Sequence, residues 1–208
     1  MSADAELLER WRAGDKAAGE QLFERHFDAV ARFFRNKVTH GIDDLIQRTF
    51  LACVESRDKF RGDSSFRTYL FGVAHNVLGN HYRSKKRHGD KIDFGVTSVH
   101  DLGPSPSVIV AKHREQRMLL EALRRIPLDH QVVLELYYWE KLTAAEVGSV
   151  VGVPEGTART RIRRAKQLLE QEMAKLSESK DQLHTTIANL DDWAASLREQ
   201  LGKSGGEG

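Results

Sequence analysis

A run of basic residues in the C-terminal third of the sequence offers its clearest chemistry. Five of the eight residues in Arg159–Lys166 are arginine or lysine, and no acidic residue interrupts them. Upstream, Thr143 and Glu146 have the spacing of a capping box, which predicts the start of a short helix. Gly152 and Pro154 then predict a tight turn and the start of a second helix. Together, these features predict a helix-turn-helix.

The distribution of charge around this second helix suits binding in a DNA groove. At about 100° per residue, Arg159, Arg163 and Lys166 share one side. Arg161 and Arg164 flank that side. A helix that enters the major groove meets phosphates on both flanks and base edges ahead, and the free N–H groups at its start can bind a further phosphate. The alternative is an arginine-rich surface helix that binds nothing.

A second basic segment, Ser64–Arg87, combines aromatic and polar side chains. Tyr69, His75, Asn76 and Tyr82 can stack on unpaired bases or hydrogen-bond to them. Basic residues follow at its end, namely Arg83, Lys85, Lys86 and Arg87. The more common explanation is an amphipathic helix whose basic end interacts favourably with the helix dipole. By itself, this segment indicates no specific function.

The composition excludes several classes of protein. The 208 residues include 32 basic and 30 acidic ones, so the net charge is only +2, and the single cysteine excludes a disulfide framework. No apolar run approaches the ~20 residues of a membrane-spanning helix, and the acidic N-terminus lacks a signal-peptide core. We therefore expect a soluble, cytoplasmic protein. The scattered histidines and the lack of a glycine-rich loop after a strand predict no metal, no cofactor and no enzymatic activity.

The hydrophobic periodicity predicts an all-α fold with two small helical domains. In the first domain, helices are expected at 5–13, at 15–38, after a cap at Asp43, and after a cap at Ser64 or Ser65. In the second, they are expected at 108–125, from a cap at Asp129 to Trp139, at 143–151, and from Glu155 onward. The expected division is a first domain at 1–88, a flexible linker at 89–107, a helix-turn-helix domain at 108–175 and a C-terminal amphipathic helix at 176–208.

Several motifs resemble those of bacterial RNA polymerase sigma factors. Region two of such factors is similar to Asp43–Gln47, Phe60–Gly62, Phe66–Asn76 and Tyr82–Arg83. Region four is similar to Ile126–Val133, Leu142–Val147 and Gly156–Ala165. Because only a linker separates the two regions, the sequence resembles sigma factors of the extracytoplasmic-function (ECF) type. The resemblance spans about residues 5–175.

The resemblance implies that the chain binds core RNA polymerase and promoter DNA, with an anti-sigma factor as a further expected partner. It places the polymerase contact on Asp43, Asp44, Gln47, Arg48 and Thr49. Contacts to the minus-ten element fall on Arg61, Gly62, Ser64, Ser65, Asn76, His81, Arg83 and Lys86, where the loop at 61–65 captures a flipped base. Contacts to the minus-thirty-five element fall on Thr157, Arg159, Thr160, Arg161, Arg163 and Arg164.

Arg48 departs from the family pattern, in which this position of the polymerase-facing helix carries an acidic residue. A basic side chain where the interface expects a carboxylate is repulsive. Phosphorylation of the adjacent Thr49 would add negative charge there, which leads to the hypothesis of a sigma factor that a Ser/Thr kinase switches on. In the alternative, Arg48 points into solvent and Thr49 is an ordinary helix residue.

The C-terminal extension is a second departure. From Ile162 to Leu197, leucine or isoleucine recurs every seven residues, which predicts a coiled-coil or docking helix. Because the extension is acidic, it can mask the basic DNA-reading surfaces. Alternatively, it packs against the second domain or mediates self-association.

Two other functions fit parts of the sequence. One is a stand-alone helix-turn-helix transcription regulator whose first domain serves as a sensor or dimerisation unit. The other is an interaction scaffold that assembles through the heptads and shows no salt-sensitive DNA binding. The region-two motifs argue against the first, because such a regulator does not need them.

Overall fold

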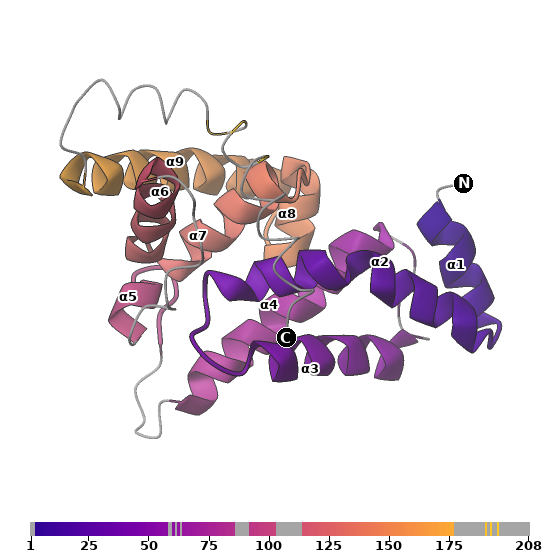
Figure 1. Cartoon of the computed structure of the whole chain (residues 1–208). Helices are drawn as coiled ribbons and strands as arrows, with labels where there is room; N and C mark the ends of the chain where they lie inside the picture. The colour runs from indigo at the N-terminus through magenta and orange to yellow at the C-terminus, as the bar shows by residue number, and fades with distance from the viewer. Residues whose placement is uncertain are drawn as a thin grey trace.

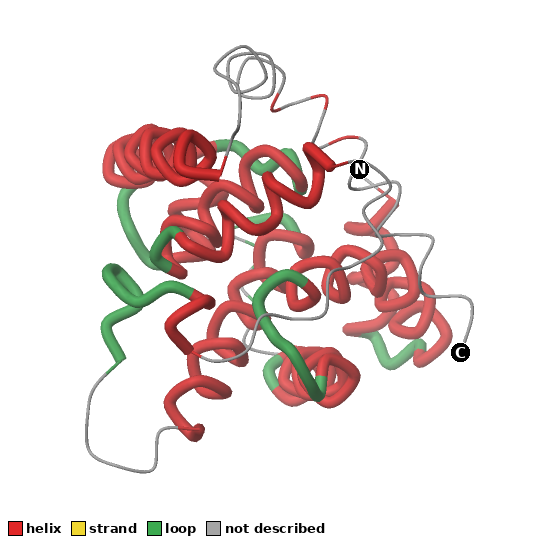
Figure 2. The backbone as a smooth tube through the Cα atoms, turned by 60° about the vertical axis from the view of Figure 1, so that its left-hand side comes forward, coloured by secondary structure: helices red, strands yellow, loops and turns green. Residues whose placement is uncertain are grey.

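The computed structural model describes residues 3–57, 60, 62, 64–85, 92–102, 114–176, 190, 192 and 195. Throughout these residues the regular elements are helices, apart from one isolated bridge between Ser98 and Pro127 (Figure 2). The predicted all-α fold is therefore confirmed. No helix in this part of the chain is both long and apolar enough to cross a membrane.

The N-terminal half is a bundle of α1 (Ala3–Arg12), α2 (Lys16–Arg35), α3 (Ile42–Glu55) and α4 (Phe66–Lys85). In Figure 1, α2 crosses the molecule above α3, and α1 packs against α2. Asp15 caps α2, because its side chain accepts a hydrogen bond from the Ala18 N–H. A Cβ on Gly19 would lie 2.5 Å from the Trp11 ring. Only glycine at this position lets α1 and α2 approach so closely.

The C-terminal half contains α5 (Val99–Leu102), α6 (Arg114–Arg125), α7 (Leu128–Leu134), the π-helical turn η2 (Glu135–Trp139), α8 (Ala144–Val151) and α9 (Glu155–Leu176). Helix α9 runs along the top of the molecule in Figure 1, and α6, α7 and α8 pack against its inner side. The buried side chains of α9 recur at helical spacing and are Ala158, Ile162, Ala165, Leu169 and Met173. This apolar stripe determines which side of α9 faces outward.

The local geometry of the helix-turn-helix confirms the sequence prediction. The Thr143 hydroxyl accepts a hydrogen bond from the Glu146 N–H, and the Glu146 carboxylate accepts one from the Thr143 N–H, which completes the capping box. Helix α8 ends at Gly152, whose φ of 71° is in the left-handed region that favours glycine. The turn folds back tightly, because a Cβ on Gly148 would lie 2.6 Å from the Val153 carbonyl oxygen.

The predicted N-caps of two helices were wrong, and so was the predicted α-helical end of one of them. The N-cap of α3 is Gly41, with a φ of 78°, and Asp43 lies in the first turn, where its charge still favours the helix N-terminus. The N-cap of α7 is Pro127 instead of Asp129. The helix expected to end at Trp139 is α-helical only to Leu134, and its last turn is the π-helical η2.

The segment predicted as a linker at 89–107 contains regular structure among its described residues. It includes the short helix α5, in which Val99 is buried. The N–H groups of Leu128 and Asp129 donate to the carbonyls of Thr97 and Phe94, both at 3.0 Å. These bonds attach the segment to the start of α7. A four-residue helix is too short to produce a detectable hydrophobic period, which is why the sequence did not reveal it.

Candidate nucleic-acid and polymerase-binding surfaces

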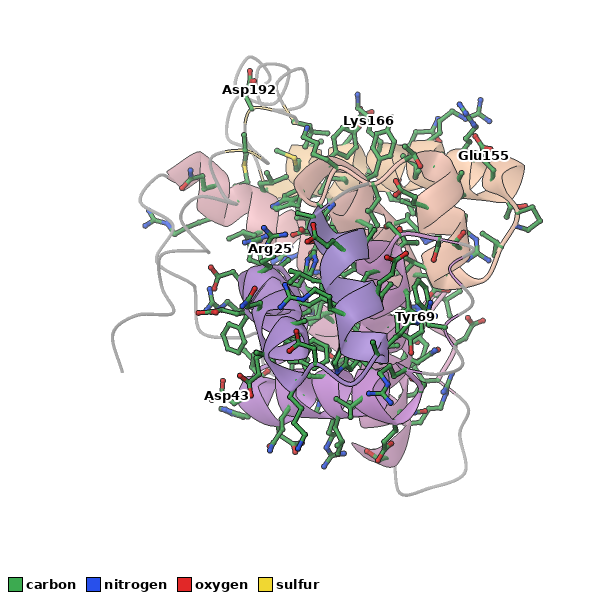
Figure 3. All side chains as sticks on the ribbon, turned by 90° about the vertical axis from the view of Figure 1, so that its right-hand side faces the viewer. Arg25, Asp43, Tyr69, Glu155, Lys166 and Asp192 are labelled. Carbon is green, nitrogen blue, oxygen red and sulfur yellow. The ribbon has the colours of Figure 1, made fainter. Side chains whose placement is uncertain are left out.

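The outer face of α9 presents the residues predicted to contact the minus-thirty-five element. Thr157, Arg159, Thr160, Arg163 and Arg164 are exposed, and Arg161 is half-buried. Arg159 forms an ion pair with Glu155, one turn earlier, at 2.5 Å. A DNA phosphate that binds Arg159 must therefore compete with the Glu155 carboxylate. Figure 3 shows Glu155 and Lys166 along the same outer edge of the molecule.

The C-terminal extension lies mostly outside the described residues. Leu190 is only 2% exposed, so it packs against other side chains. Figure 3 places Asp192 at the same end of the molecule as Lys166 and far from Asp43. Masking of the DNA-reading surfaces, packing against the second domain and self-association therefore all stay predictions.

The predicted minus-ten residues lie on α4 and in the loop before it. Gly62, Ser64, Ser65, Asn76, His81 and Arg83 are described, whereas Arg61 and Lys86 lie outside the described residues. Ser65 has a structural role, because its hydroxyl accepts a hydrogen bond from the Thr68 N–H at 3.1 Å and so caps α4. Further along the helix, Asn76 and Arg83 are exposed and His81 is half-buried.

A cavity of about 420 Å³ separates this face of α4 from the end of α8. Two residues of the predicted minus-ten set line it, Ser64 and Asn76, together with the aromatic side chains of Tyr69 and His75. The opposite wall is Ser149–Gly152, which belongs to the helix-turn-helix. The sequence pointed to the α4 residues individually. It did not predict that the helix-turn-helix would face them, because no local pattern encodes a contact between distant segments.

His75 lies in a part of this cavity that disfavours its protonated form. Burial lowers the pKa of His75 below its ordinary value, and the nearby positive charges of Lys37, Arg83 and Arg161 act in the same direction, opposed by Asp129. The unfolded chain therefore binds a proton at this position more readily than the folded chain does. Stability from this group is present above pH ~6.5 and is lost as the pH falls from there toward the folded-state pKa.

We expect His75→Gln to make the melting temperature less dependent on pH. Between about pH 7.5 and about pH 5, the wild-type melting temperature should fall more steeply than that of the variant. The matched control is His100→Gln, which removes an imidazole with an exposed side chain and should keep the wild-type slope. Identical slopes for all three proteins would contradict the assignment to His75.

The exposed side of α3 carries the charged residues predicted to bind polymerase. Asp43, Asp44, Gln47 and Arg48 are all exposed. Arg48 forms an ion pair with Asp44 at 2.9 Å, one helical turn away. The side chain of Arg48 thus points into solvent, as the simpler of the two interpretations stated. Its positive charge is balanced locally, so it needs no phosphate beside it.

Next to these charges lies an apolar groove of about 540 Å³, which the sequence analysis missed. Asp43 and Gln47 line it together with Phe27, Ile46, Phe50, Leu51 and Val54. Three of the apolar side chains are unusually exposed for their type, with Phe27 at 44%, Leu51 at 54% and Val54 at 47%. An exposed apolar groove with a polar rim is typical of a protein-binding surface.

Thr49 does not lie where a kinase can reach it. Its side chain is fully buried, and its hydroxyl donates a hydrogen bond to the Leu45 carbonyl at 2.7 Å. Phosphorylation would require α3 to leave the core. The hypothesis of a Thr49 switch therefore finds no support in the structure, and Thr49 is best described as a core residue of α3.

We expect Thr49→Val to fold and to function like the wild type. Valine has nearly the same shape, and only one internal hydrogen bond is lost, so the free energy of unfolding should change by about 1 kcal/mol or less. Transcription in cells should stay within about twofold of wild type at this loss of stability. An inactive Thr49→Val protein with an unchanged melting temperature would instead restore the phosphorylation hypothesis.

Comparison with known proteins agrees with this geometry. Residues 22–88 match the family described as Sigma-70 region 2, and residues 116–169 match Sigma-70, region 4. The chain is 28% identical over 182 residues to the ECF RNA polymerase sigma-E factor of Escherichia coli K12, covering 83% of this chain and 95% of that protein. It is 27% identical over 184 residues to the same factor of Haemophilus influenzae, covering 83% and 96%.

Solved structures share the fold. CnrH, in complex with the cytosolic domain of CnrY, superposes with a TM-score of 0.62 at 21% identity, over 85% of this chain and 100% of that chain. The sigma factor RpoE in complex with the anti-sigma factor NepR, from Bartonella quintana, superposes with a TM-score of 0.56 at 18% identity, over 76% and 98%.

An all-α chain with a basic helix-turn-helix after a first helical domain has the architecture of a DNA-binding protein of the kind that recognises promoters. The family matches make this assignment more definite. The chain belongs to the sigma-70 family and, within it, to the ECF sigma factors. It directs promoter recognition in transcription initiation. The alternative of a stand-alone regulator is set aside, because residues 22–88 match region 2.

Proposed function

We propose that three surfaces of this sigma factor each bind a different partner during transcription initiation. The outer face of α9 reads the minus-thirty-five element, the face of α4 and its preceding loop bind the melted minus-ten strand, and α3 with its apolar groove docks on core RNA polymerase. The observation that carries the proposal is the composition of α9. Its exposed face holds Arg159, Arg163 and Arg164, whereas its inner face is apolar and buried. This is the arrangement of a recognition helix.

The proposed domain division follows the same surfaces, with the polymerase and minus-ten functions in residues 1–88 and the minus-thirty-five function in residues 108–175. Such a protein acts in the cytoplasm, where it meets polymerase and DNA, and it catalyses no reaction of its own. Both solved structures contain a bound protein, the cytosolic domain of CnrY in the CnrH complex and the anti-sigma factor NepR in the RpoE complex. We expect a partner of this kind here too, and the groove beside α3 is a surface that suits it.

Run-off transcription with purified core polymerase tests the proposal. A library of genomic fragments serves as template, and the sequenced transcripts should start downstream of one shared pair of promoter elements. No transcription above that of core polymerase alone would contradict the proposal.

A matched pair of variants tests the docking surface. Asp43→Arg should weaken binding to core polymerase by about tenfold or more, because it reverses a charge at the rim of the groove. Glu20→Arg makes the same change at an exposed position of α2 and should bind like the wild type. Equal binding of the two variants would place the polymerase contact elsewhere.

A further inference from the structure

Helix α1 packs at the edge of the N-terminal half, against α2 and the start of α4 (Figure 1). Trp11, near the end of α1, is only 6% exposed. Its ring meets Phe23 of α2 and Phe66, the first residue of α4, edge to face, with ring centroids 5.1 Å and 6.4 Å apart. Aromatic pairs prefer this geometry. A single side chain of α1 therefore contacts the residue at which α4 begins.

Two arginines connect α1 to the chain between α3 and α4. The Arg57 guanidinium lies over the Trp11 ring, 5.8 Å from its centroid, and Arg57 Nη1 donates to the Trp11 carbonyl at 3.4 Å. From α1 itself, the Arg12 guanidinium lies over the ring of Phe60, 5.2 Å from its centroid. A cation over an aromatic face is attracted by the ring quadrupole. Phe60 lies outside the helices but is only 8% exposed, so side-chain contacts hold it in place.

The other end of α1 is fixed to α2. The Asp4 carboxylate accepts from Arg25 Nη1 at 3.1 Å and lies 2.8 Å from Nε2 of the buried His26. Leu7 and Leu8 add buried apolar contacts. A ten-residue helix is marginally stable by itself, so these tertiary contacts keep α1 folded. Helix α1 is therefore a fixed support and not a frayed terminus.

Tyr69 connects these contacts to the cavity beside α4. Its ring centroid lies 4.6 Å from that of Phe60 and 6.3 Å from that of Phe66. Its hydroxyl shares a hydrogen bond with Ser56, which follows α3. Tyr69 also lines the cavity, together with Asn76 of the predicted minus-ten set. The two aromatic rings that α1 contacts therefore determine where Tyr69 lies.

A fixed cavity wall favours capture of a base. Flipping a base out of the stack costs free energy, which contacts in the pocket must offset. A pocket whose side chains are already in place loses less conformational entropy on binding than one that must first become ordered. Support of this wall from behind should therefore increase both affinity for the correct base and discrimination against the others.

We propose that α1 is a positioning element for minus-ten recognition, which holds Phe60 and the start of α4 so that Tyr69 keeps its place in the cavity. Trp11 acts on Phe66, and Arg12 acts on Phe60. Both are positioning residues, because they act through other side chains and not on the DNA. The inference rests on the proposed assignment of the α4 face to the minus-ten strand.

Amide hydrogen exchange on the protein alone tests whether α1 holds the start of α4. The Thr68 N–H donates to the Ser65 hydroxyl and the Tyr69 N–H to the Ser65 carbonyl, both at 3.1 Å, so the two protons report on the first turn. Trp11→Leu should make these protons exchange about tenfold faster. Arg12→Gln changes an exposed side chain, so it is safe for folding, and should make them exchange about threefold faster.

Each variant has a matched control. Arg10→Gln makes the same change on α1 as Arg12→Gln, at an exposed residue that pairs with Asp15 in the turn after the helix. Trp139→Leu makes the same change as Trp11→Leu, at a tryptophan of similar burial in the C-terminal half, where it is 4% exposed. It should also lower the melting temperature. Both controls should show wild-type exchange at the start of α4.

Base discrimination by the holoenzyme tests whether this support serves promoter recognition. The probe is a promoter fragment from the run-off experiment with its minus-ten element unpaired, in which each base of the element is changed in turn to the other three. At the most selective position, Trp11→Leu should lower discrimination between the correct base and the others about tenfold, and Arg12→Gln about threefold. For both variants, affinity for a fragment that carries only the minus-thirty-five element should equal that of the wild type. The two controls should keep wild-type discrimination.

A double-mutant cycle separates positioning from direct contact with DNA. Phe60→Leu removes the ring that the Arg12 guanidinium covers. If Arg12 acts through Phe60, Arg12→Gln should change discrimination little further in the Phe60→Leu background. An undiminished effect there would mean that Arg12 touches DNA itself, and it would overturn the positioning role of this residue.

Wild-type exchange at the start of α4 in both Trp11→Leu and Arg12→Gln would overturn the support by α1. Faster exchange with wild-type discrimination would overturn its role in minus-ten recognition. If the wild-type holoenzyme itself distinguishes no base in the minus-ten element, the proposed function fails, and the role of α1 in recognition fails with it. The exchange measurement needs neither polymerase nor DNA, so these failures are distinguishable.

Discussion

Replacing Gly148 with alanine should destabilise the helix-turn-helix by about 2–3 kcal/mol. A Cβ at this position would lie 2.6 Å from the Val153 carbonyl oxygen and 3.5 Å from the Glu155 nitrogen. Both are backbone atoms of the turn, so they cannot move aside as the end of a flexible side chain can. Relief of the clash requires α8 and α9 to separate. The expected result is a melting temperature lowered by several degrees and weaker binding to promoter DNA.

Gly156→Ala is the matched control for this prediction. Gly156 also lies in a helix of the same motif, but a Cβ there would meet nothing within 4 Å. Alanine should therefore stabilise α9 by about 0.5 kcal/mol, because it loses less backbone entropy than glycine on folding. Differential scanning calorimetry on both variants measures the contrast. Equal melting temperatures would show that the turn can widen without cost.

Arg163→Ala should reduce affinity for a promoter fragment that contains the minus-thirty-five element by about 10- to 100-fold. Arg163 is exposed in α9, on the same side as Arg159, and we propose that this side enters the major groove. Melting temperature should not change, because the side chain supports no core contact. Binding is measured with the complete polymerase holoenzyme, because a sigma factor recognises promoters as part of that complex.

Salt dependence distinguishes the two roles that Arg163 can have. If it reads a base, the variant should lose discrimination between promoters, and the dependence of affinity on salt should stay the same. If it binds a phosphate, affinity should fall for all sequences and the salt slope should decrease by about one. The control is Lys175→Ala near the end of α9, where Lys175 pairs with Glu172. Equal affinities for both variants would remove Arg163 from the DNA contact.

The helix-turn-helix was predictable because its determinants are local. The capping box at Thr143 and the left-handed Gly152 depend on residues within one turn of each other, and both are where the sequence placed them. At α3, the buried stripe is Leu45, Ile46, Thr49 and Cys53, so Thr49 lies in the core and not on the polymerase-facing surface where the resemblance placed it. Threonine four residues from both Leu45 and Cys53 was the available clue, because its methyl group suits a core position.

The interface between the halves was not predictable from local patterns. Lys37 and Glu135, which form an ion pair across it, are 98 residues apart, and the local sequence around each of them predicts an ordinary charged residue on the surface. The π-helical turn is similarly hidden, because Glu135–Trp139 has the composition of a regular amphipathic helix. Such features arise from packing between distant segments, which local propensity does not encode.

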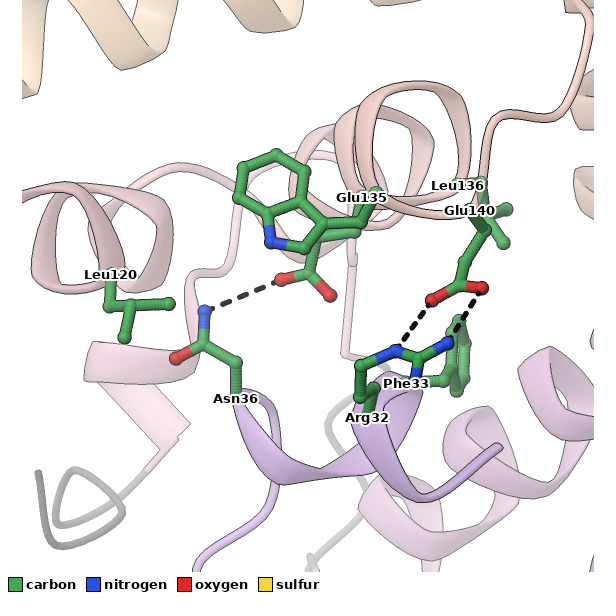
Figure 4. A pocket seen from close by; sticks show the side chains of 8 residues that line it. Arg32, Phe33, Asn36, Leu120, Glu135, Leu136 and Glu140 are labelled. Carbon is green, nitrogen blue, oxygen red and sulfur yellow. Dashed lines mark hydrogen bonds and ion pairs between the residues drawn. The ribbon is translucent and has the colours of Figure 1, made fainter. Parts of the chain in front are cut away.

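The π-helical turn also makes the contact between the halves tolerant of a change in chain length. A turn of this kind holds one residue more than an α-helical turn, so deleting one residue between Glu135 and Glu140 would let a regular helix form. Glu140 would then lie four residues after Glu135, about 40° away around the helix, so the chain after the deletion would keep nearly its present orientation. Glu140 would still face its ion-pair partners, Arg32 (Figure 4) and Arg67. The π-helical turn therefore accommodates one additional residue without a change in the contacts on either side of it, and we expect related chains to differ by single-residue insertions or deletions at this position.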